Sequence, residues 1–162
     1  MYFICAKLIN NFILQNKFSK NINIIPTGIE VERFFPENID KKDVNVLKKR
    51  YSINKKDFII IFVGRLEKKK NIDFILEIEQ ELIKKHGNIK LLIVGDGPER
   101  IKYEQYSEEL DIASNVIFTG KVPWKEIPNY YNLADLFITA STSETQGLTV
   151  LEAMASEVVP LC

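Results

Sequence analysis

The chain has 162 residues, of which 46% are hydrophobic, and this is enough apolar material for one domain with its own core. Its 22 basic residues balance 22 acidic ones, so it lacks the basic excess typical of a protein that binds nucleic acid. The two cysteines, Cys5 and Cys162, lie at opposite ends without metal-ligand spacing, which favours a reducing compartment and argues against a disulfide framework.

Segments with the patterns of helices and strands alternate along the chain. Helices are predicted over residues 4–15, 44–51, 71–85, 98–110 and 124–132, and from residue 148 onward. Strands are predicted at residues 23–25, 58–63, 90–94, 115–118 and 136–139, and the chain ends within a further one. This alternation predicts an α/β fold with a Rossmann-like doubly wound parallel sheet.

Residues 1–20 are apolar but interrupted by Lys7, Asn10 and Asn11. The segment is too short and too broken to span a bilayer, and it lacks the basic start and cleavage site of a signal peptide. A helix on a membrane surface is one interpretation. A helix that docks on another domain fits the composition better.

The predicted helix 71–85 ends in a run of basic residues, with His86 and Gly87 just beyond it. His86 is the one histidine of the chain, and its position favours a capping cation over a catalytic base. The helix is expected to bury an apolar stripe made of Ile72, Phe74, Ile75, Ile78 and Leu82.

The segment ASTSETQGLTVLEAMAS at residues 140–156 joins a predicted strand to a predicted helix, with Gly147 at the turn. Backbone N–H groups at the start of a helix carry partial positive charge and suit a phosphate. Glu144 in the loop and Glu152 in the helix can accept hydrogen bonds from sugar hydroxyls. A phosphate flanked by sugar rings is a nucleotide-sugar. An acid near a helix start is more often a cap, so this ligand class needs a second cluster.

The second cluster is FVGRLEKKKN at residues 62–71, which follows a strand predicted to be buried on both faces. Loops that leave the carboxyl edge of a parallel sheet are where open α/β folds bind ligands. Arg65, directly after Gly64, can donate to two phosphate oxygens, and Lys70 can add a point charge. Lys68 and Lys69 are better explained as a solvated basic loop.

Three aromatic residues, Trp124, Tyr130 and Tyr131, gather in the predicted helix 124–132. A nucleobase could stack on one of these rings. Their spacing favours packing of the helix onto the sheet, so all three are left out of the predicted site. The chain contains no Asp-x-Asp triplet, and no metal site is predicted.

From Ile22 onward the chain resembles the C-terminal, donor-binding half of a retaining GT-B glycosyltransferase of the family-four, or group 1, type. The likeness rests on five segments in the family's order: IIPTGIEVERFFP, FVGRLEKKKNIDFIL, LLIVGDGPER, VIFTGKVPWKEIPNYYNLADLFI and SETQGLTVLEAMA. One such segment would be weak support, whereas five in order are specific. The segment SETQGLT further resembles the corresponding segment of glucosyltransferases that act on diacylglycerol lipids.

The resemblance implies a role for each matching position. Arg65 and Lys70 match a basic pair that neutralises the departing diphosphate, and Glu144 matches an acid near the hydroxyls of the transferred sugar. These three are the expected catalytic residues. The expected donor-binding residues are Glu152 on the ribose diol, Gly147 and Leu148 with backbone N–H groups toward the diphosphate, Gly64, Gly95 and Gly97 at the edge of the donor cleft, and Val122 beside the base.

The resemblance also implies a domain organisation in which the chain is truncated at both ends. Residues 1–21 would be a remnant or connector of a missing N-terminal acceptor domain, and residues 22–162 an incomplete nucleotide-sugar-binding domain. The chain departs from the family pattern at two positions. Glu157 stands where the family usually has a small residue, and the family's proline comes one position before Pro160.

The expected function is binding of a nucleotide-diphosphate sugar, with UDP-hexose favoured by its frequency in such families, for retaining transfer to a lipid or glycan acceptor. No metal or other cofactor is expected. The expected location is the cytoplasm, with peripheral contact at the inner membrane face as an option. A non-catalytic nucleotide-binding module, an inactive gene fragment, and a phosphorylase or epimerase with the same fold remain alternatives.

Overall fold

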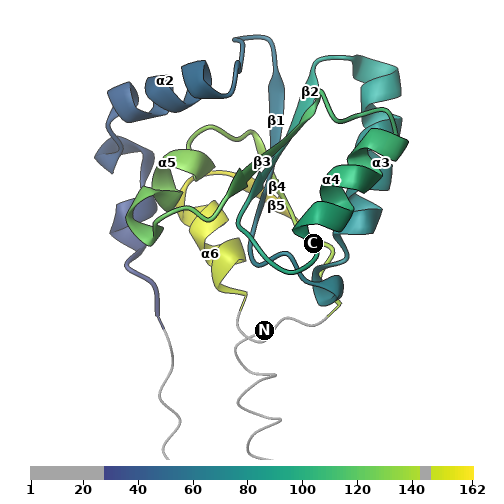
Figure 1. Ribbon diagram of the computed structural model, residues 1–162. Coiled ribbons are helices and arrows are strands. Elements are labelled where there is room, and N and C mark those ends of the chain that lie inside the picture. The colour runs from purple at the N-terminus through teal and green to yellow at the C-terminus, as the bar shows by residue number, and fades with distance from the viewer. Residues whose placement is uncertain (1–27, 143–146) are drawn as a thin grey trace, which may run out of the picture.

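A five-stranded, wholly parallel sheet forms the centre of the computed structural model, which describes residues 28–142 and 147–162. The strand order is β3-β2-β1-β4-β5, with β1 in the middle (Figure 1). The strands are β1 (Phe58–Val63), β2 (Ile89–Val94), β3 (Val116–Gly120), β4 (Leu136–Ile138) and β5 (Val159–Leu161). This is the doubly wound α/β arrangement that the sequence predicts.

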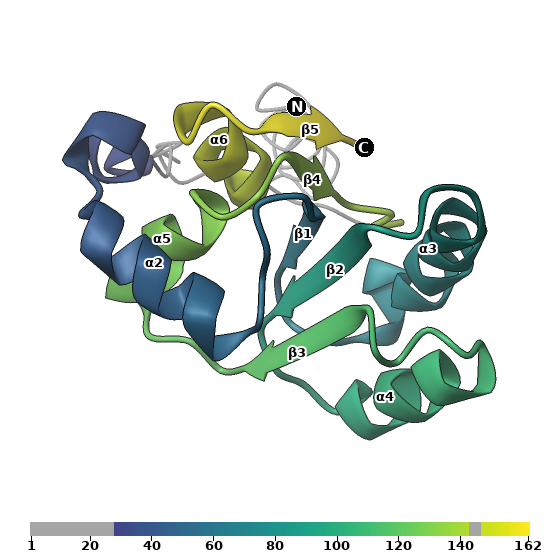
Figure 2. The ribbon, with the colours of Figure 1, turned by 90° about the horizontal axis from the view of Figure 1, so that it is seen from above.

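Helices cover both faces of this sheet. Figure 2 shows α3 (Ile72–His86) and α4 (Arg100–Glu109) on one side, with α2 (Lys41–Arg50), α5 (Ile127–Tyr131) and α6 (Leu148–Ala155) on the other. Four short 3-10 helices complete the described part: η1 (Val31–Phe34), η2 (Pro36–Asn38), η3 (Lys68–Lys70) and η4 (Trp124–Glu126). Because the strands are parallel, the loops that follow them gather at one edge of the sheet.

The side chains of β1 alternate between two hydrophobic cores. Ile60 and Phe62 pack into the core beneath α3 and α4, whereas Ile59 and Ile61 pack into the core beneath α2, α5 and α6. All four are buried, which confirms the prediction that the apolar run at residues 58–63 is a strand covered on both faces.

The buried stripe of α3 differs from the predicted one. Its buried residues are Ile72, Ile75, Leu76 and Glu79, a spacing that keeps them on one helix face. Phe74 was expected in the core but is 49% exposed. The helix is therefore rotated from the prediction, and a carboxylic acid occupies the core position that follows Ile72, Ile75 and Leu76.

Most element ends lie within a few residues of the predicted ones. Gly87 ends α3 with a positive φ of 66°, as its place after the basic run predicts. The helix predicted from residue 98 begins at Arg100 instead, because the preceding residue is held in a turn in which the Glu99 N–H donates to the carbonyl of Leu66 at 3.2 Å. The helix predicted over 124–132 is split into η4 and α5.

Several predicted features fall outside the described residues: the helix at 4–15, the strand at 23–25 and Glu144. Across residues 28–142 and 147–162, none of the helices combines the length and the apolar character that crossing a bilayer requires.

Candidate functional site

The loops after β1 and β2 are joined backbone to backbone at the carboxyl edge of the sheet. The Gly64 N–H donates to the carbonyl of Val94 at 3.0 Å, and the Leu66 N–H donates to the carbonyl of Asp96 at 3.0 Å. These bonds continue the β1–β2 pairing beyond the strands and hold the first residues of the β1 loop in place.

Glycines make this close approach possible. Gly95 has φ +139°, and a Cβ added there would collide with the carbonyl oxygen of Gly64. A Cβ at Gly97 would likewise collide with the backbone of Leu66. The structure therefore gives both glycines a packing function between the two loops. Their predicted contact with a donor stays a prediction.

A cavity of about 280 Å³ opens at this edge, and four of the predicted site residues line it. They are Gly64, Arg65, Gly95 and Val122, contributed by the segments that follow β1, β2 and β3. The remaining lining residues are Val63, Val94, Asp96, Lys121, Trp124 and Ile127.

Arg65 presents its charge to solvent in this cavity. Its side chain is 71% exposed, and its Nε lies 2.9 Å from Oε1 of Glu67. The Lys69 ammonium lies 3.1 Å from the other carboxylate oxygen of Glu67. A hydrogen bond from Lys69, with the charges of Lys69, Arg65 and Lys70, lowers the pKa of Glu67. One ionised carboxylate therefore organises a loop that carries an excess of positive charge.

The loop after β4 is bound to the same basic loop. The Thr142 N–H donates to the carbonyl of Lys69 at 3.0 Å, and the Thr142 and Ser141 hydroxyls donate to that oxygen at 3.2 and 3.4 Å. The structure thus brings the two clusters that the sequence singles out, around residues 65 and 144, into contact. Glu144 itself lies beyond the described residues.

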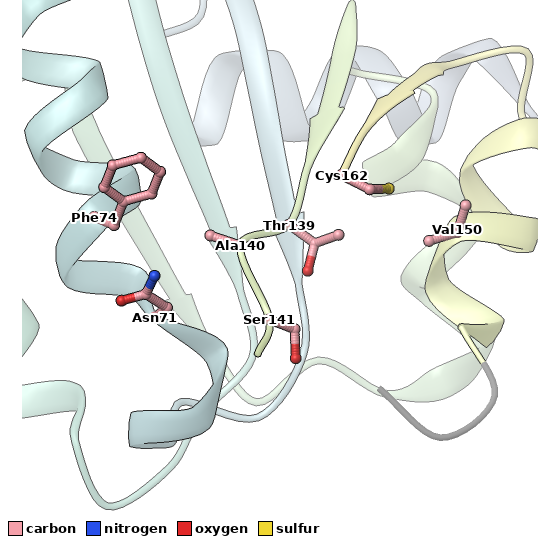
Figure 3. Close-up of a pocket in the computed structure, with 7 residues that line it drawn as sticks. All are labelled: Asn71, Phe74, Thr139, Ala140, Ser141, Val150 and Cys162. Carbon is pink, nitrogen blue, oxygen red and sulfur yellow. The ribbon is translucent and has the colours of Figure 1, made fainter. Parts of the chain in front are cut away.

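A second cavity, of about 360 Å³, lies beside this junction. Figure 3 shows residues from the start of α3, the segment after β4, the helix α6 and the last position of the chain around it: Asn71, Phe74, Thr139, Ala140, Ser141, Val150 and Cys162. Asn71 has a positive φ of 52°, a left-handed conformation that asparagine adopts more readily than most other non-glycine residues. It lies where the basic loop turns into α3.

Lys70 and Gly147 line neither of these two cavities, and neither do Gly97 or Leu148. Lys70 ends η3, and Gly147 precedes α6 with φ +63°, as expected of a glycine at that turn. Convergence of Lys70, Arg65 and the start of α6 on one ligand stays a prediction.

Glu152 is buried between α5 and α6, with 8% of its surface exposed. Its Oε2 accepts a hydrogen bond from the Tyr131 hydroxyl at 3.0 Å, and that hydroxyl also lies 3.1 Å from the carbonyl oxygen of Thr149. Burial raises the pKa of Glu152, and the Tyr131 hydrogen bond opposes the shift. The carboxylate is therefore held in a fixed orientation, while its predicted contact with ribose stays a prediction.

The three aromatic residues of the 124–132 segment differ in their surroundings. Tyr130 and Tyr131 are 2% and 0% exposed, which confirms their packing role. The same expectation was wrong for Trp124, which is 52% exposed and lines the 280 Å³ cavity. Its ring lies against the Arg33 guanidinium, 3.7 Å from the ring centroid. Helical spacing does not apply to Trp124, because it lies in η4, directly after Pro123 and before α5 begins.

The sequence prediction missed Arg33 and Trp124 as residues beside the site. Pro128 was the available signal for Trp124, since a proline is favoured in the first turn of a helix and so indicates a helix that begins after Trp124. Within residues 28–142 and 147–162 there is no group of three or more His, Cys, Asp or Glu residues that could hold a metal ion. His86 is the last residue of α3, as a capping cation requires.

Comparison with curated proteins finds similar synthases. An alpha-monoglucosyldiacylglycerol synthase of Streptococcus pneumoniae is 34% identical over 151 residues, which cover 93% of this chain and 34% of that protein. The enzyme of the same description in Acholeplasma laidlawii is 32% identical over 156 residues, covering 96% and 39%. The chain thus spans between a third and two fifths of the length of these relatives.

Solved glycosyltransferase structures share the fold. WaaG, a glycosyltransferase involved in lipopolysaccharide biosynthesis, matches 94% of this chain and 40% of its own, with TM-score 0.74 and 23% identity. Anabaena HepE in complex with UDP and glucose matches 85% and 37%, with TM-score 0.71 and 19% identity. The C-terminal domain of a group 1 glycosyl transferase from Francisella tularensis matches 82% and 69%, with TM-score 0.68 and 25% identity.

The model of the family "Glycosyl transferases group 1" matches residues 43–162. This stretch contains the whole sheet and every predicted site residue. The chain therefore belongs to the group 1 glycosyltransferases and has the Rossmann-like half of their GT-B fold.

Proposed function

We propose that this domain binds a UDP-hexose donor for retaining transfer to a lipid acceptor, as part of an enzyme with a second domain that holds the acceptor. The observation that carries the proposal is the junction at Lys69, where the loop after β4 is hydrogen-bonded to the basic loop after β1. Lys69 and Arg65 share the partner Glu67 in this loop, and Arg65 is exposed and lines the 280 Å³ cavity.

The chemistry of transfer explains the need for cations at this edge. When the bond between the anomeric carbon and the phosphate oxygen breaks, negative charge develops on the departing diphosphate. Preorganised cations aimed at that charge stabilise the transition state. In this proposal Arg65 leaves Glu67 to donate to two phosphate oxygens, and Lys70 and the first N–H groups of α6 contribute the remaining positive charge.

The sugar and the ribose need hydroxyl partners. We place the ribose diol at Glu152, whose carboxylate is already oriented by Tyr131. We place the transferred hexose toward the 360 Å³ cavity, where Asn71, Thr139 and Ser141 offer polar side chains. Glu144 keeps its predicted role at the sugar hydroxyls.

The relatives support the choice of hexose and acceptor. Two curated relatives at 34% and 32% identity are described as synthases of a glucosylated diacylglycerol. We therefore propose glucose as the transferred sugar and diacylglycerol, or a glycosylated form of it, as the acceptor. A lipid acceptor would place the whole enzyme at a membrane surface.

Calorimetric titration of the chain with UDP, UDP-glucose, GDP and inorganic phosphate tests the donor proposal. We expect UDP and UDP-glucose to bind, and Arg65→Ala and Lys70→Ala each to weaken binding about 10- to 100-fold, because each removes a charged hydrogen bond to phosphate. Lys85→Ala removes an exposed lysine at the far end of α3 and is the matched control.

Two results would separate the alternatives. If the chain is folded and calorimetry detects no binding heat with any of the nucleotides, the result would contradict donor binding and favour an inactive fragment. For turnover, an acceptor domain from a similar enzyme is joined to the chain, and transfer of labelled glucose from UDP-glucose to diacylglycerol vesicles is measured. UDP binding without transfer in that fusion would favour a non-catalytic nucleotide-binding module.

A further inference from the structure

Trp124 is the one tryptophan of the chain, and it lines the 280 Å³ cavity. Large aromatic side chains usually bury most of their surface, yet Trp124 is 52% exposed. One partner is the planar guanidinium of Arg33, 3.7 Å from the ring centroid, which comes from η1 and is paired with Glu30 at 3.3 Å. The ring is thus held against a cation from a distant segment while much of its surface stays available.

The cavity that Trp124 lines has an apolar part and a charged part, as a nucleotide does. Four apolar side chains line the same cavity: Val63, Val94, Val122 and Ile127. The exposed cation Arg65 lines it as well. A nucleoside diphosphate has the same division, since a flat apolar-faced base is joined through ribose to a dianionic or trianionic diphosphate.

We propose that Trp124 is the surface on which the nucleobase of the donor stacks, and that Arg33 is a positioning residue that holds the indole ring for it. This inference rests on the proposed function, because it assumes that a nucleoside diphosphate occupies the cavity. It adds the aromatic contact for the base and assigns a role to the η1 segment.

The Arg33 contact gives the stack a physical advantage. An exposed tryptophan side chain samples several rotamers, and a ligand that stacks on it must stop that motion at an entropic cost. A guanidinium stacked on the ring removes part of this freedom before the ligand arrives. Stacking is tolerant of base identity because every base has a π-face. Trp124 should therefore distinguish ligands that carry a base from those that do not.

Tryptophan fluorescence reports on this contact directly, because no second indole contributes to the signal. The chain is titrated with UDP and, separately, with inorganic pyrophosphate, while calorimetry measures binding of each in parallel. We expect UDP to change the Trp124 emission at concentrations that match its calorimetric affinity, and bound pyrophosphate to leave the emission nearly unchanged.

The outcomes separate this inference from the proposed function. Heat from UDP with unchanged tryptophan emission would overturn the stacking role and leave donor binding intact. An equal emission change with pyrophosphate would also overturn it, since a base-free ligand cannot stack. Absence of heat from UDP would overturn the proposed function and this inference with it.

Substitutions extend the test. Trp124→Ala is expected to weaken UDP binding about tenfold without changing pyrophosphate binding, and Trp124→Phe to retain most of the affinity. Arg33→Ala should weaken UDP binding by less than Trp124→Ala does, and it should increase the mobility of the indole, measured by fluorescence anisotropy. Arg33→Lys should lie between Arg33→Ala and wild type in both UDP affinity and indole mobility. Val46→Ala, at a comparably exposed apolar position on α2, is the matched control. Circular dichroism verifies the fold, and equal UDP affinity in Trp124→Ala and wild type would contradict the proposal.

Discussion

Glu79 lies in the core beneath α3 with 1% of its surface exposed. Among the residues that the structure describes, its Oε1 has no hydrogen-bond partner. Burial raises the pKa of this carboxyl from 4.5 to about 7, because the charged form loses its hydration. The folded state therefore keeps the Glu79 proton at pH values where the unfolded chain has released it.

The sign and size of the effect follow from this difference. Between pH 4.5 and 7 the folded protein binds more protons than the unfolded one, so the free energy of unfolding falls as the pH rises. Below pH 4.5 and above pH 7 the contribution is constant. The total loss across this window is about 3 kcal/mol, a large fraction of the stability of an ordinary domain.

Glu79→Gln removes the ionisation while keeping the size of the side chain. We expect the variant to match the wild type near pH 4.5 and to exceed it by about 3 kcal/mol at pH 8. The measurement is urea unfolding followed by circular dichroism at both pH values. The difference between the two proteins isolates Glu79 from the other carboxyls.

Glu81→Gln is the control on the same helix. Glu81 is exposed and its pKa is lowered by Lys84, which bonds it at 2.8 Å, so this variant should gain no stability at high pH. A Glu79→Gln variant whose stability relative to wild type is the same at pH 4.5 and pH 8 would refute the reasoning, because the carboxyl would then be hydrated or paired.

Three other substitutions test two glycine conformations and one buried hydrogen bond. Gly95→Ala should lower the melting temperature strongly or prevent folding, because its Cβ would collide with Gly64. Gly87→Ala, at φ +66° with open space around it, should cost only about 1–2 kcal/mol in thermal unfolding, and equal losses at the two glycines would contradict the collision. Tyr131→Phe removes the hydroxyl that bonds Glu152 and should cost about 1 kcal/mol in urea unfolding; an unchanged midpoint would show that the bond contributes nothing.

The sheet could be predicted from the sequence because its strands are continuous apolar runs between clear breaks. The run at Phe58–Val63 is an example, since buried parallel strands need apolar side chains on both faces. Gly87 marked the end of α3 for an equally local reason. Such features depend on neighbouring residues alone.

The features that the sequence did not reveal depend on distant or backbone contacts. The hydrogen bonds from Ser141 and Thr142 are accepted by the backbone carbonyl of Lys69. Every residue carries such a carbonyl, so the residue type at position 69 does not predict these bonds. The stack of Arg33 on Trp124 joins segments on either side of the first three strands. Glu79 was hidden for another reason, because an acid within a helix is normally read as part of its solvated face.

Amide chemical shifts recorded during a titration with UDP show whether the ligand binds at the carboxyl edge of the sheet. We predict that the resonances of four residues that line the 280 Å³ cavity move together with one affinity: Gly64, Arg65, Gly95 and Val122. Residues of α2, on a different part of the surface, should stay unchanged. Shifts confined to α2, or no saturable shifts at the carboxyl edge of the sheet, would contradict this prediction.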